Sequence, residues 1–566
     1  MSVAVRPPDG GAPVTTEVVL ATINARYQHA SLGLRYLFAN AGDLQDRMAI
    51  VELVGGRPTE ELAGRLLGHR PRVVALGVYI WNVVQTTDLV RHIRRVEPGV
   101  AIVLGGPEVS HEADLQPICA LADHVVQGPG DISFPKLVRG LLDGPRPLMR
   151  IIPGEQPDLA ALALPYRHYT DRDLRERFIY VEASRGCPFK CEFCLSALDK
   201  TAWPFPLDRF LAEMATLHAR GARRFKFVDR TFNLKPATSL AIMDFFLDRI
   251  ERAPGDPCFA HFELVPDHLP DSLKAAIPRF PAGTLQFEIG IQSFDPTVQA
   301  LISRRQDNER AEANLRWLLA HSSAHLHVDL IAGLPGETMD SFASGFDRLA
   351  AIGPHEIQVG ILKRLRGAPI VRHERAGRLH FAPQAPYEVI ETDTMSAEEL
   401  TSIRLLARFH DLIANGGRMP RLAGLVMEGA PFRRMLALSR FLLDRFGRVH
   451  SIPLETLFDG VIDWLRQDCR RDEASLQQAA LADYQGCGAK GRLAFMRRGL
   501  SIGGENRREE PDAHRPDAAH PPEVKHPGAA TDPAGAAAGP AVPRPRAPAT
   551  AAAAPIRQAR HLHAGR

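Results

Sequence analysis

The feature that most narrows the possible folds is a repeated alternation of short Val- and Ile-rich runs with amphipathic stretches. The runs are too short for helices and predict buried strands, whereas stretches such as 86–96 predict helices. Because strands that alternate with helices form parallel sheets covered on both faces, residues 17–145 are predicted to form a Rossmann-like, doubly wound α/β domain. Such domains bind ligands beyond the carboxyl ends of their strands. The predicted strands of this domain are 17–24, 72–79, 100–106 and 123–128.

The same alternation resumes after a proline-rich linker, residues 146–177. Six strand–helix units of about 35 residues follow, fewer than the eight of a closed barrel. Residues 178–375 are therefore predicted to form a partial (β/α)6 barrel. Its predicted strands are 177–184, 223–230, 258–264, 285–293, 326–333 and 355–362.

The remaining segments differ in composition from these two domains. Residues 1–16 read as a disordered start, and residues 376–502 are predicted to be helical. Residues 503–566 are rich in Pro and Ala and cannot bury enough apolar surface to fold, so they are predicted to be a disordered tail.

Composition bears mainly on the compartment. Seven cysteines, an odd number, argue against a disulfide framework and favour a reducing compartment. No signal peptide and no apolar run of membrane-spanning length is recognised, so a cytoplasmic protein without a membrane partner is expected. The formal net charge of +3 gives no indication of nucleic-acid binding.

Three of the seven cysteines lie within eight positions, in the segment RGCPFKCEFC. The spacing of Cys187, Cys191 and Cys194 is too open for one strand or one helical face and suits a loop that wraps a metal group. A structural zinc site normally needs four ligands, and no second cysteine pair or histidine pair follows. Three cysteines can instead hold an iron–sulfur cluster with one iron left open, because such clusters normally take four. A zinc loop remains the alternative at this point.

The pattern C-x3-C-x2-C just after a first barrel strand, with Phe193 before its last cysteine, resembles the radical S-adenosylmethionine superfamily. The resemblance implies that Cys187, Cys191 and Cys194 bind a [4Fe-4S] cluster whose fourth iron is chelated by S-adenosylmethionine. It further implies reductive cleavage to a 5′-deoxyadenosyl radical, which abstracts hydrogen from an inert carbon. A flavodoxin or ferredoxin would be the reductant.

Later strand ends resemble the same superfamily, in FELVPD (262–267), FEIGIQS (287–293) and DLIAGLPGE (329–337). By this resemblance Glu263, Gln292 and Ser293 face the methionyl or ribose part of S-adenosylmethionine. The turn that begins at Gly333 and Leu334 would pack against adenine. The second strand end departs from the family pattern, since FVDRTFN stands where many members have a Gly-Gly-Glu-Pro-like stretch. Asp229 or local carbonyl groups are the candidates for its contact with the amino group.

The first domain resembles that of the cobalamin-binding branch of this superfamily, on VVALGVYIWN, VAIVLGGPEVS and HVVQGPGDISFPKL. Four glycines at its strand ends would let the backbone approach a large planar ligand: Gly105, Gly106, Gly128 and Gly130. The cobalt-ligating motif Asp-x-His-x-x-Gly is absent, and His29 is interpreted as a structural or pocket residue. A first domain that binds no cobalamin is the alternative.

The branch implies methylation of an unactivated carbon as a hypothesis, and two other functions remain open. A tRNA methylthiotransferase shares the barrel, but its first domain carries three cluster cysteines, whereas here that domain has only Cys119. A non-catalytic cobalamin or redox sensor would use the cluster as a reporter. The other isolated cysteines, Cys258, Cys469 and Cys487, are interpreted as ordinary thiols.

Overall fold

A computed structural model describes residues 16–199, 201–468 and 472–500. The chain divides into two units, Met1–Ala489 with Pro555–Arg566 and Lys490–Ala554. Of the second unit only α19 (Ala494–Leu500) is a described element, and everything below concerns the first unit. The predicted tail at 503–566 and Cys469 lie outside the described residues, as does nearly all of the predicted disordered start.

The first domain is a parallel sheet of six strands in the order β2-β1-β3-β4-β5-β6. Its strands are β1 (Val18–Asn24), β2 (Met48–Val54), β3 (Val73–Gly77), β4 (Ala101–Gly105), β5 (His124–Gln127) and β6 (Ile151–Pro153). Its helices are α1 (Leu32–Ala39), α2 (Thr59–Leu67), α3 (Val83–Val96), α4 (Pro117–Leu121) and α5 (Ser133–Asp143). The strand order reverses at β1, as in a doubly wound sheet.

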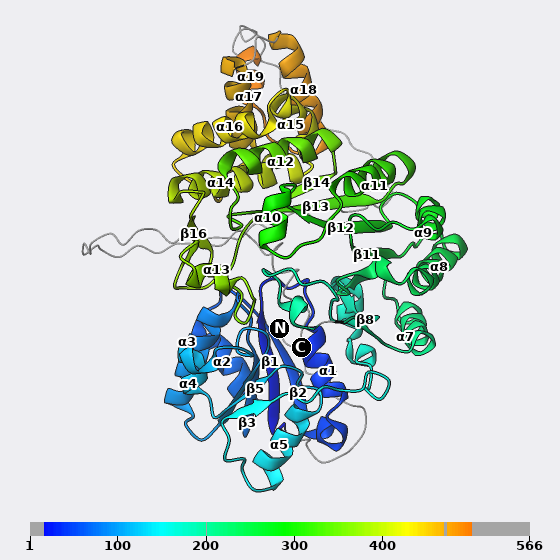
Figure 1. The fold of residues 1–566 in the computed structure, drawn as a ribbon, viewed down its shortest axis with the longest axis vertical. Coiled ribbons are helices and arrows are strands. Elements are labelled where there is room, and N and C mark those ends of the chain that lie inside the picture. Colours follow the sequence, from blue (N-terminus) through cyan, green and yellow to red (C-terminus); the bar gives the residue numbers. More distant parts are fainter. Residues whose placement is uncertain (1–15, 200, 469–471, 501–566) are drawn as a thin grey trace, which may run out of the picture. The chain divides into compact units, whose positions relative to one another are not determined.

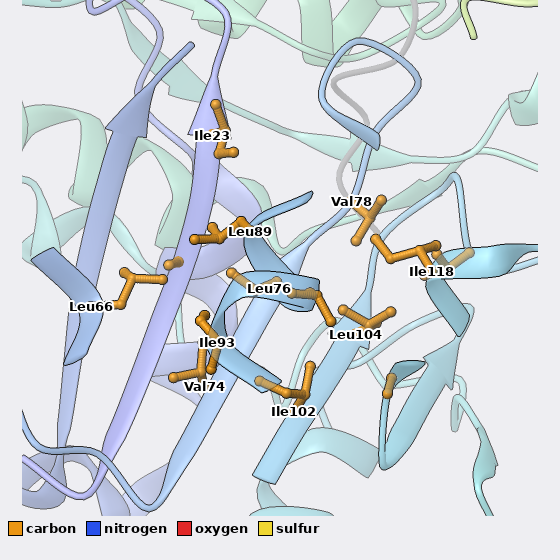
Figure 2. Packing of buried hydrophobic residues seen from close by; sticks show 14 of the residues in the cluster. Ile23, Leu66, Val74, Leu76, Val78, Leu89, Ile93, Ile102, Leu104 and Ile118 are labelled. Atoms are coloured by element: carbon orange, nitrogen blue, oxygen red, sulfur yellow. The ribbon is translucent and has the colours of Figure 1, made fainter. Parts of the chain in front are cut away.

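Helices cover both faces of this sheet (Figure 1). Successive strand residues alternate between two cores: Val19 and Ala21 pack with α2, α3 and α4, whereas Val18 and Leu20 pack with α1 and α5. Figure 2 shows part of the first core, where Leu76 of β3 lies between Leu89 and Leu104. Both faces of the central strands are therefore buried, which explains why their sequences are continuous apolar runs.

The second sheet has the order β14-β13-β12-β11-β10-β7, and all of its strands are parallel. Its strands are β7 (Ile179–Val181), β10 (Arg224–Phe227), β11 (Phe259–Leu264), β12 (Leu285–Gln292), β13 (His325–Ala332) and β14 (Glu356–Ile361). The helices of this part are α6 (Asp171–Glu176), α7 (Leu207–Ala219), α8 (Pro236–Arg252), α9 (Asp271–Ala276), α10 (Pro296–Leu301), α11 (Asn308–His321) and α12 (Met339–Ile352). The predicted fold class, a Rossmann-like domain followed by a six-stranded partial barrel, is confirmed.

The carboxy-terminal part is mainly helical, as expected, but it begins with an antiparallel hairpin. Its elements are α13 (Val371–Arg375), β15 (Leu379–Phe381), β16 (Val389–Thr392), α14 (Ala397–His410), α15 (Pro420–Met427), α16 (Pro431–Phe446), α17 (Leu454–Asp468) and α18 (Glu473–Gly486). None of the helices in the described part of the chain combines the length and apolarity needed to cross a bilayer.

Three strand segments differ from the sequence-based expectation. The edge strand β2 was not predicted, and β6 lies in the segment expected to be a linker, so the first sheet continues beyond residue 145. The third is the hairpin β15–β16, within the region expected to be helical. Because β6 has three residues and none of them is buried, it carries no apolar pattern from which a strand could be predicted.

Candidate functional site

The cysteine loop follows β7 and is fixed by a short antiparallel pairing of β8 (Ser184–Arg185) with β9 (Trp203–Pro204). Gly186 joins this pairing to Cys187 with a φ of +90°, a left-handed conformation that favours glycine. A Cβ atom there would collide with the carbonyl oxygen of Thr201. The backbone at this position therefore requires glycine both for its conformation and for space.

Cys187, Cys191 and Cys194 line one open cavity, whose empty space including open solvent is about 800 Å³. Burial raises the pKa of Cys187 to about 12 and also raises that of Cys191, which Arg304 partly offsets. Among the described residues, no group of three His, Cys, Asp or Glu side chains is close enough together to hold a single metal ion. Thiolates around a four-iron cluster bind different irons and need not meet at one point. Three thiols open to one cavity fit such a cluster, which would keep them deprotonated.

The opposite wall of this cavity comes from the carboxyl ends of the barrel strands. Arg230 after β10 forms an ion pair with Glu263 of β11 at 3.1 Å, and both side chains are more than nine-tenths buried. Asp329 of β13 and Glu288 of β12 also reach the cavity. Charged and polar groups thus line the same open cavity as the thiols.

Three of the residues predicted to contact S-adenosylmethionine line this cavity: Phe193, Glu263 and Gln292. Gln292 is 3% exposed and has a φ of +70°, which is unusual for a residue other than glycine. Its Oε1 atom is buried without a hydrogen-bond partner among the described residues. Since an unpartnered buried amide oxygen costs free energy, this side chain is suited to a ligand that donates a hydrogen bond.

Ser293, Gly333 and Leu334 lie away from the cavity lining. The Ser293 hydroxyl donates to Glu337 Oε1 at 2.7 Å. Gly333 has a φ of +82°, and a Cβ atom there would come within 2.5 Å of Val389 in the β15–β16 hairpin. The turn therefore packs against the carboxy-terminal part, and its contact with adenine stays a prediction.

Asp229, a candidate for holding the amino group of S-adenosylmethionine, faces the entry to the cysteine loop. Its carboxylate accepts hydrogen bonds from Ala183 N–H at 3.0 Å and Ser184 Oγ at 2.6 Å. Burial raises its pKa to about 7. At this strand end Arg230 and Thr231, not Asp229, line the cavity.

The sequence prediction missed the positive side of the cavity. Arg304, Arg305 and Gln306, from the loop between α10 and α11, all line it. The Nη1 atom of Arg304 lies 3.6 Å from Cys191 Sγ, and its guanidinium also donates to the Gly290 carbonyl. A charge run in a loop gives no sign that it returns to the strand ends, because only the folded connection brings it there.

The glycines of the first domain also line a single cavity, of about 650 Å³. All four predicted positions contribute to it: Gly105, Gly106, Gly128 and Gly130. At Gly106 a Cβ atom would lie 2.6 Å from the Val78 carbonyl oxygen, whereas at Gly128 it would meet nothing within 4 Å. Tyr36 and Asp131 complete a mostly apolar lining. Gly106 is therefore required by the packing of its backbone on Val78, whereas Gly128 leaves open space in a mostly apolar cavity, which suits a flat ligand group.

His29 and Cys119 have other places in the fold. His29 Nδ1 lies 2.5 Å from the Tyr180 hydroxyl, and its backbone bridges Phe178. His29 is not among the residues that line the glycine cavity, and its contacts join the first domain to the barrel. Cys119 is fully buried in the apolar core of the first domain.

Comparisons with known proteins agree with this architecture. The family described as "B12 binding domain" matches residues 18–138, and "Radical SAM superfamily" matches residues 181–349. A 2-(S-pantetheinyl)-carbapenam-3-carboxylate methyltransferase of Streptantibioticus cattleyicolor is 27% identical over 58% of this chain and 55% of its own length. The cobalamin-dependent radical SAM methyltransferase TokK of Streptomyces tokunonensis is 24% identical over 75% of this chain and 65% of its own length. The match thus spans less than two thirds of either relative.

Among solved structures, the cobalamin-dependent S-adenosylmethionine radical enzyme OxsB has a TM-score of 0.55, with 13% identity over 86% of this chain and 83% of its own. At that identity the likeness concerns the fold. Two matched domains in this order, the loop of three cysteines and the glycine-lined cavity together identify the group. The chain belongs to the radical SAM superfamily, in the branch whose radical SAM domain follows a B12-binding domain.

Proposed function

We propose that this chain is a radical S-adenosylmethionine enzyme that methylates an unactivated carbon with the help of cobalamin. The observation that carries the proposal is that the three thiols and the polar barrel strand ends share one cavity. When bound, the cluster and S-adenosylmethionine supply a 5′-deoxyadenosyl radical for hydrogen abstraction, and cobalamin supplies a methyl group. The chain itself would bind and orient these groups and exclude water.

The cavity side chains suit the parts of S-adenosylmethionine. The guanidinium groups of Arg304 and Arg305 would attract its carboxylate. Glu263 would attract its amino group if its ion pair with Arg230 were shared with the ligand. The amide of Gln292 offers an unpartnered acceptor for a ribose hydroxyl. Asp229 remains a proposed contact only through a rearrangement, because Ala183 and Ser184 already occupy its carboxylate.

Cobalamin is proposed for the cavity lined by Gly105, Gly106, Gly128 and Gly130. The named relatives include methyltransferases, and one of them is cobalamin-dependent. We propose a flavodoxin or ferredoxin as the electron donor and a cytoplasmic location, since the thiols must stay reduced to hold a cluster. The methylthiotransferase alternative has less support, because the cysteine of the first domain is buried in its core.

The test uses the full chain purified without oxygen from cobalamin-fed cells. We expect about four irons and one cobalamin per chain, and, after reduction, conversion of S-adenosylmethionine to methionine and 5′-deoxyadenosine. Cys191→Ala should lose the iron and the cleavage, whereas Cys487→Ala, a cysteine outside the cavity, should keep both. An intact cluster without cleavage would support the sensor instead. Cleavage of S-adenosylmethionine by a chain without bound cobalamin would support hydrogen abstraction alone and would contradict the methylation proposal.

A further inference from the structure

One buried arginine joins the glycine-lined cavity of the first domain to the cysteine loop of the barrel. Arg185 Nη1 lies 3.0 Å from Asp131 Oδ2, and its Nη2 lies 3.3 Å from Asp131 Oδ1. Both side chains are at most 5% exposed. Asp131 lines the glycine cavity, and Arg185 stands two positions before Cys187.

A second contact ties the same arginine to the same cavity. The Arg185 guanidinium carbon lies 4.4 Å from the centroid of the Tyr36 ring, and Tyr36 also lines the glycine cavity. The same guanidinium carbon lies 5.6 Å from the centroid of the Phe205 ring, which is itself 6.2 Å from the Tyr36 centroid, so the guanidinium contacts both rings. A ligand in the cavity would therefore touch two side chains that both hold Arg185.

The barrel side of Arg185 is equally constrained. Its Nε atom donates to Glu182 Oε1 at 2.7 Å, and its backbone pairs with Trp203. Gly186, which requires glycine, then leads directly into the first cysteine. Because these contacts fix the guanidinium relative to the loop, and close-packed interiors transmit displacements, a movement of Arg185 should move the loop.

We propose that Arg185 is a positioning residue through which occupancy of the glycine-lined cavity and binding of the cluster stabilise each other. This inference rests on the proposed function, in which cobalamin fills the glycine cavity and the thiols hold the cluster. A ligand that fixes Asp131 and Tyr36 fixes Arg185, and thereby the loop that presents Cys187. Coupling between two sites is reciprocal, so the cluster must tighten cobalamin binding by the same factor by which cobalamin tightens cluster binding.

The test measures the dissociation constant of hydroxocobalamin for the full chain with and without a reconstituted cluster. For the wild-type chain we expect binding at least about fivefold tighter with the cluster, the lower end of typical couplings. In Asp131→Asn, which loses the charge but not the shape, the ratio of the two constants should fall to about one. Arg185→Lys should behave alike, because an ammonium cannot replace the two-pronged contact.

Glu112→Gln is the matched control. Glu112 is also a first-domain carboxylate held by two guanidinium nitrogens of a distant barrel arginine, Arg364, at 2.9 and 3.0 Å, and it also accepts from Arg366 at 2.9 Å. It lines neither cavity. This variant should keep the wild-type ratio. Thermal unfolding identifies any variant that fails to fold. If Arg185→Lys fails to fold, the binding ratio of Asp131→Asn alone tests the proposal.

Several results would overturn the proposal. A wild-type ratio of one would do so, as would a fivefold ratio that survives in Asp131→Asn. Equal weakening of both constants in that variant would mean that Asp131 only contacts the ligand. If neither the wild-type chain nor any variant binds hydroxocobalamin, both the cobalamin part of the proposed function and the coupling are wrong. If the chain binds hydroxocobalamin equally with and without the cluster, only the coupling is wrong.

The reciprocal measurement needs no turnover. Iron retained at equilibrium against a competing chelator should rise when hydroxocobalamin is added to the wild-type chain and to Glu112→Gln. It should not change in Asp131→Asn. A merely structural contribution of Arg185 would lower iron retention equally with and without hydroxocobalamin, and that result would contradict the proposal.

Discussion

At the scale of single residues, burial decides the protonation state of groups that the sequence presents as ordinary carboxylates. Glu337 is 1% exposed, and Ser293 donates to one of its oxygens. Burial raises the pKa of Glu337 to about 8, so this side chain is protonated in the folded protein at pH 7. The sequence GLPGE gives no indication of this, because burial depends on the neighbours that cover the turn.

Glu337→Gln should raise the stability of the protein more at high pH than at low pH. The wild-type contribution is full below the unfolded pKa of 4.5 and is lost as pH rises through the folded pKa of about 8. Between pH 4.5 and pH 8, the free energy of unfolding of the variant should therefore rise by roughly 3–5 kcal/mol relative to wild type. Thermal unfolding at pH 5.5 and pH 8.5 measures the change. Glu398→Gln, at an exposed site, should show the same difference at both values.

At the scale of elements, one glycine determines how β8 leads into the cysteine loop. Gly186 combines a φ of +90° with a backbone oxygen in the place of a Cβ atom. Gly283 has a similar φ of +81°, but a Cβ atom there would meet nothing within 4 Å. A comparison of alanine variants at the two positions therefore distinguishes the effect of backbone strain from that of steric collision.

Gly186→Ala should displace the loop and lower the iron content after reconstitution, whereas Gly283→Ala should cost only about 1–2 kcal/mol of backbone strain. Iron analysis and thermal unfolding of both variants measure the two effects. Normal iron content in Gly186→Ala would mean that the loop moves without consequence for the thiols.

The β-sheet core offers a second prediction at this scale. Leu76 of β3 is 2% exposed among apolar side chains of α3 and β4 (Figure 2). Leu76→Ala should lower the free energy of unfolding of the first domain by roughly 2–5 kcal/mol, because it leaves a cavity. Val51→Ala, at a partly buried position of the edge strand β2, should cost less. Chemical denaturation of both variants compares them.

At the scale of the whole first unit, buried ion pairs join the Rossmann-like domain to the barrel. Glu52 of β2 accepts from Arg35 Nη2 at 2.9 Å and from Arg177 Nη1 at 2.6 Å, and Arg177 lies directly before the barrel. Burial alone would raise the pKa of Glu52, but the two guanidinium groups outweigh it and lower the pKa to about 2. Asp173 shares both arginines.

Glu52→Gln should destabilise the junction by roughly 3–5 kcal/mol at pH 7, since it leaves buried guanidinium charge uncompensated. The contribution of Glu52 is full above its unfolded pKa of 4.5 and is lost as pH falls toward about 2. The difference from wild type should therefore shrink between pH 7 and pH 3 in urea unfolding. Glu17→Gln, which removes a partner from the partly exposed Arg47 and Arg72, should cost less, about 1 kcal/mol.

The sequence by itself determined the two sheets of alternating strands and helices and the loop of three cysteines. Strand–helix alternation predicted the two sheets, because apolar periodicity follows directly from burial. The spacing of Cys187, Cys191 and Cys194 predicted a metal-binding loop, and the resemblance to the radical S-adenosylmethionine superfamily specified a cluster. The edge strands β2 and β6 were missed because half-buried strands leave a weak pattern.

Only the tertiary structure decided which polar groups share a cavity. It brought Arg304 to the cysteines, directed Asp229 toward the entry of their loop, and joined Arg185 to Asp131 across 54 positions of sequence. The physical reason is range: periodicity and turn chemistry are local, whereas the electrostatics of a site depend on side chains that meet only when the sheets have closed on their helices.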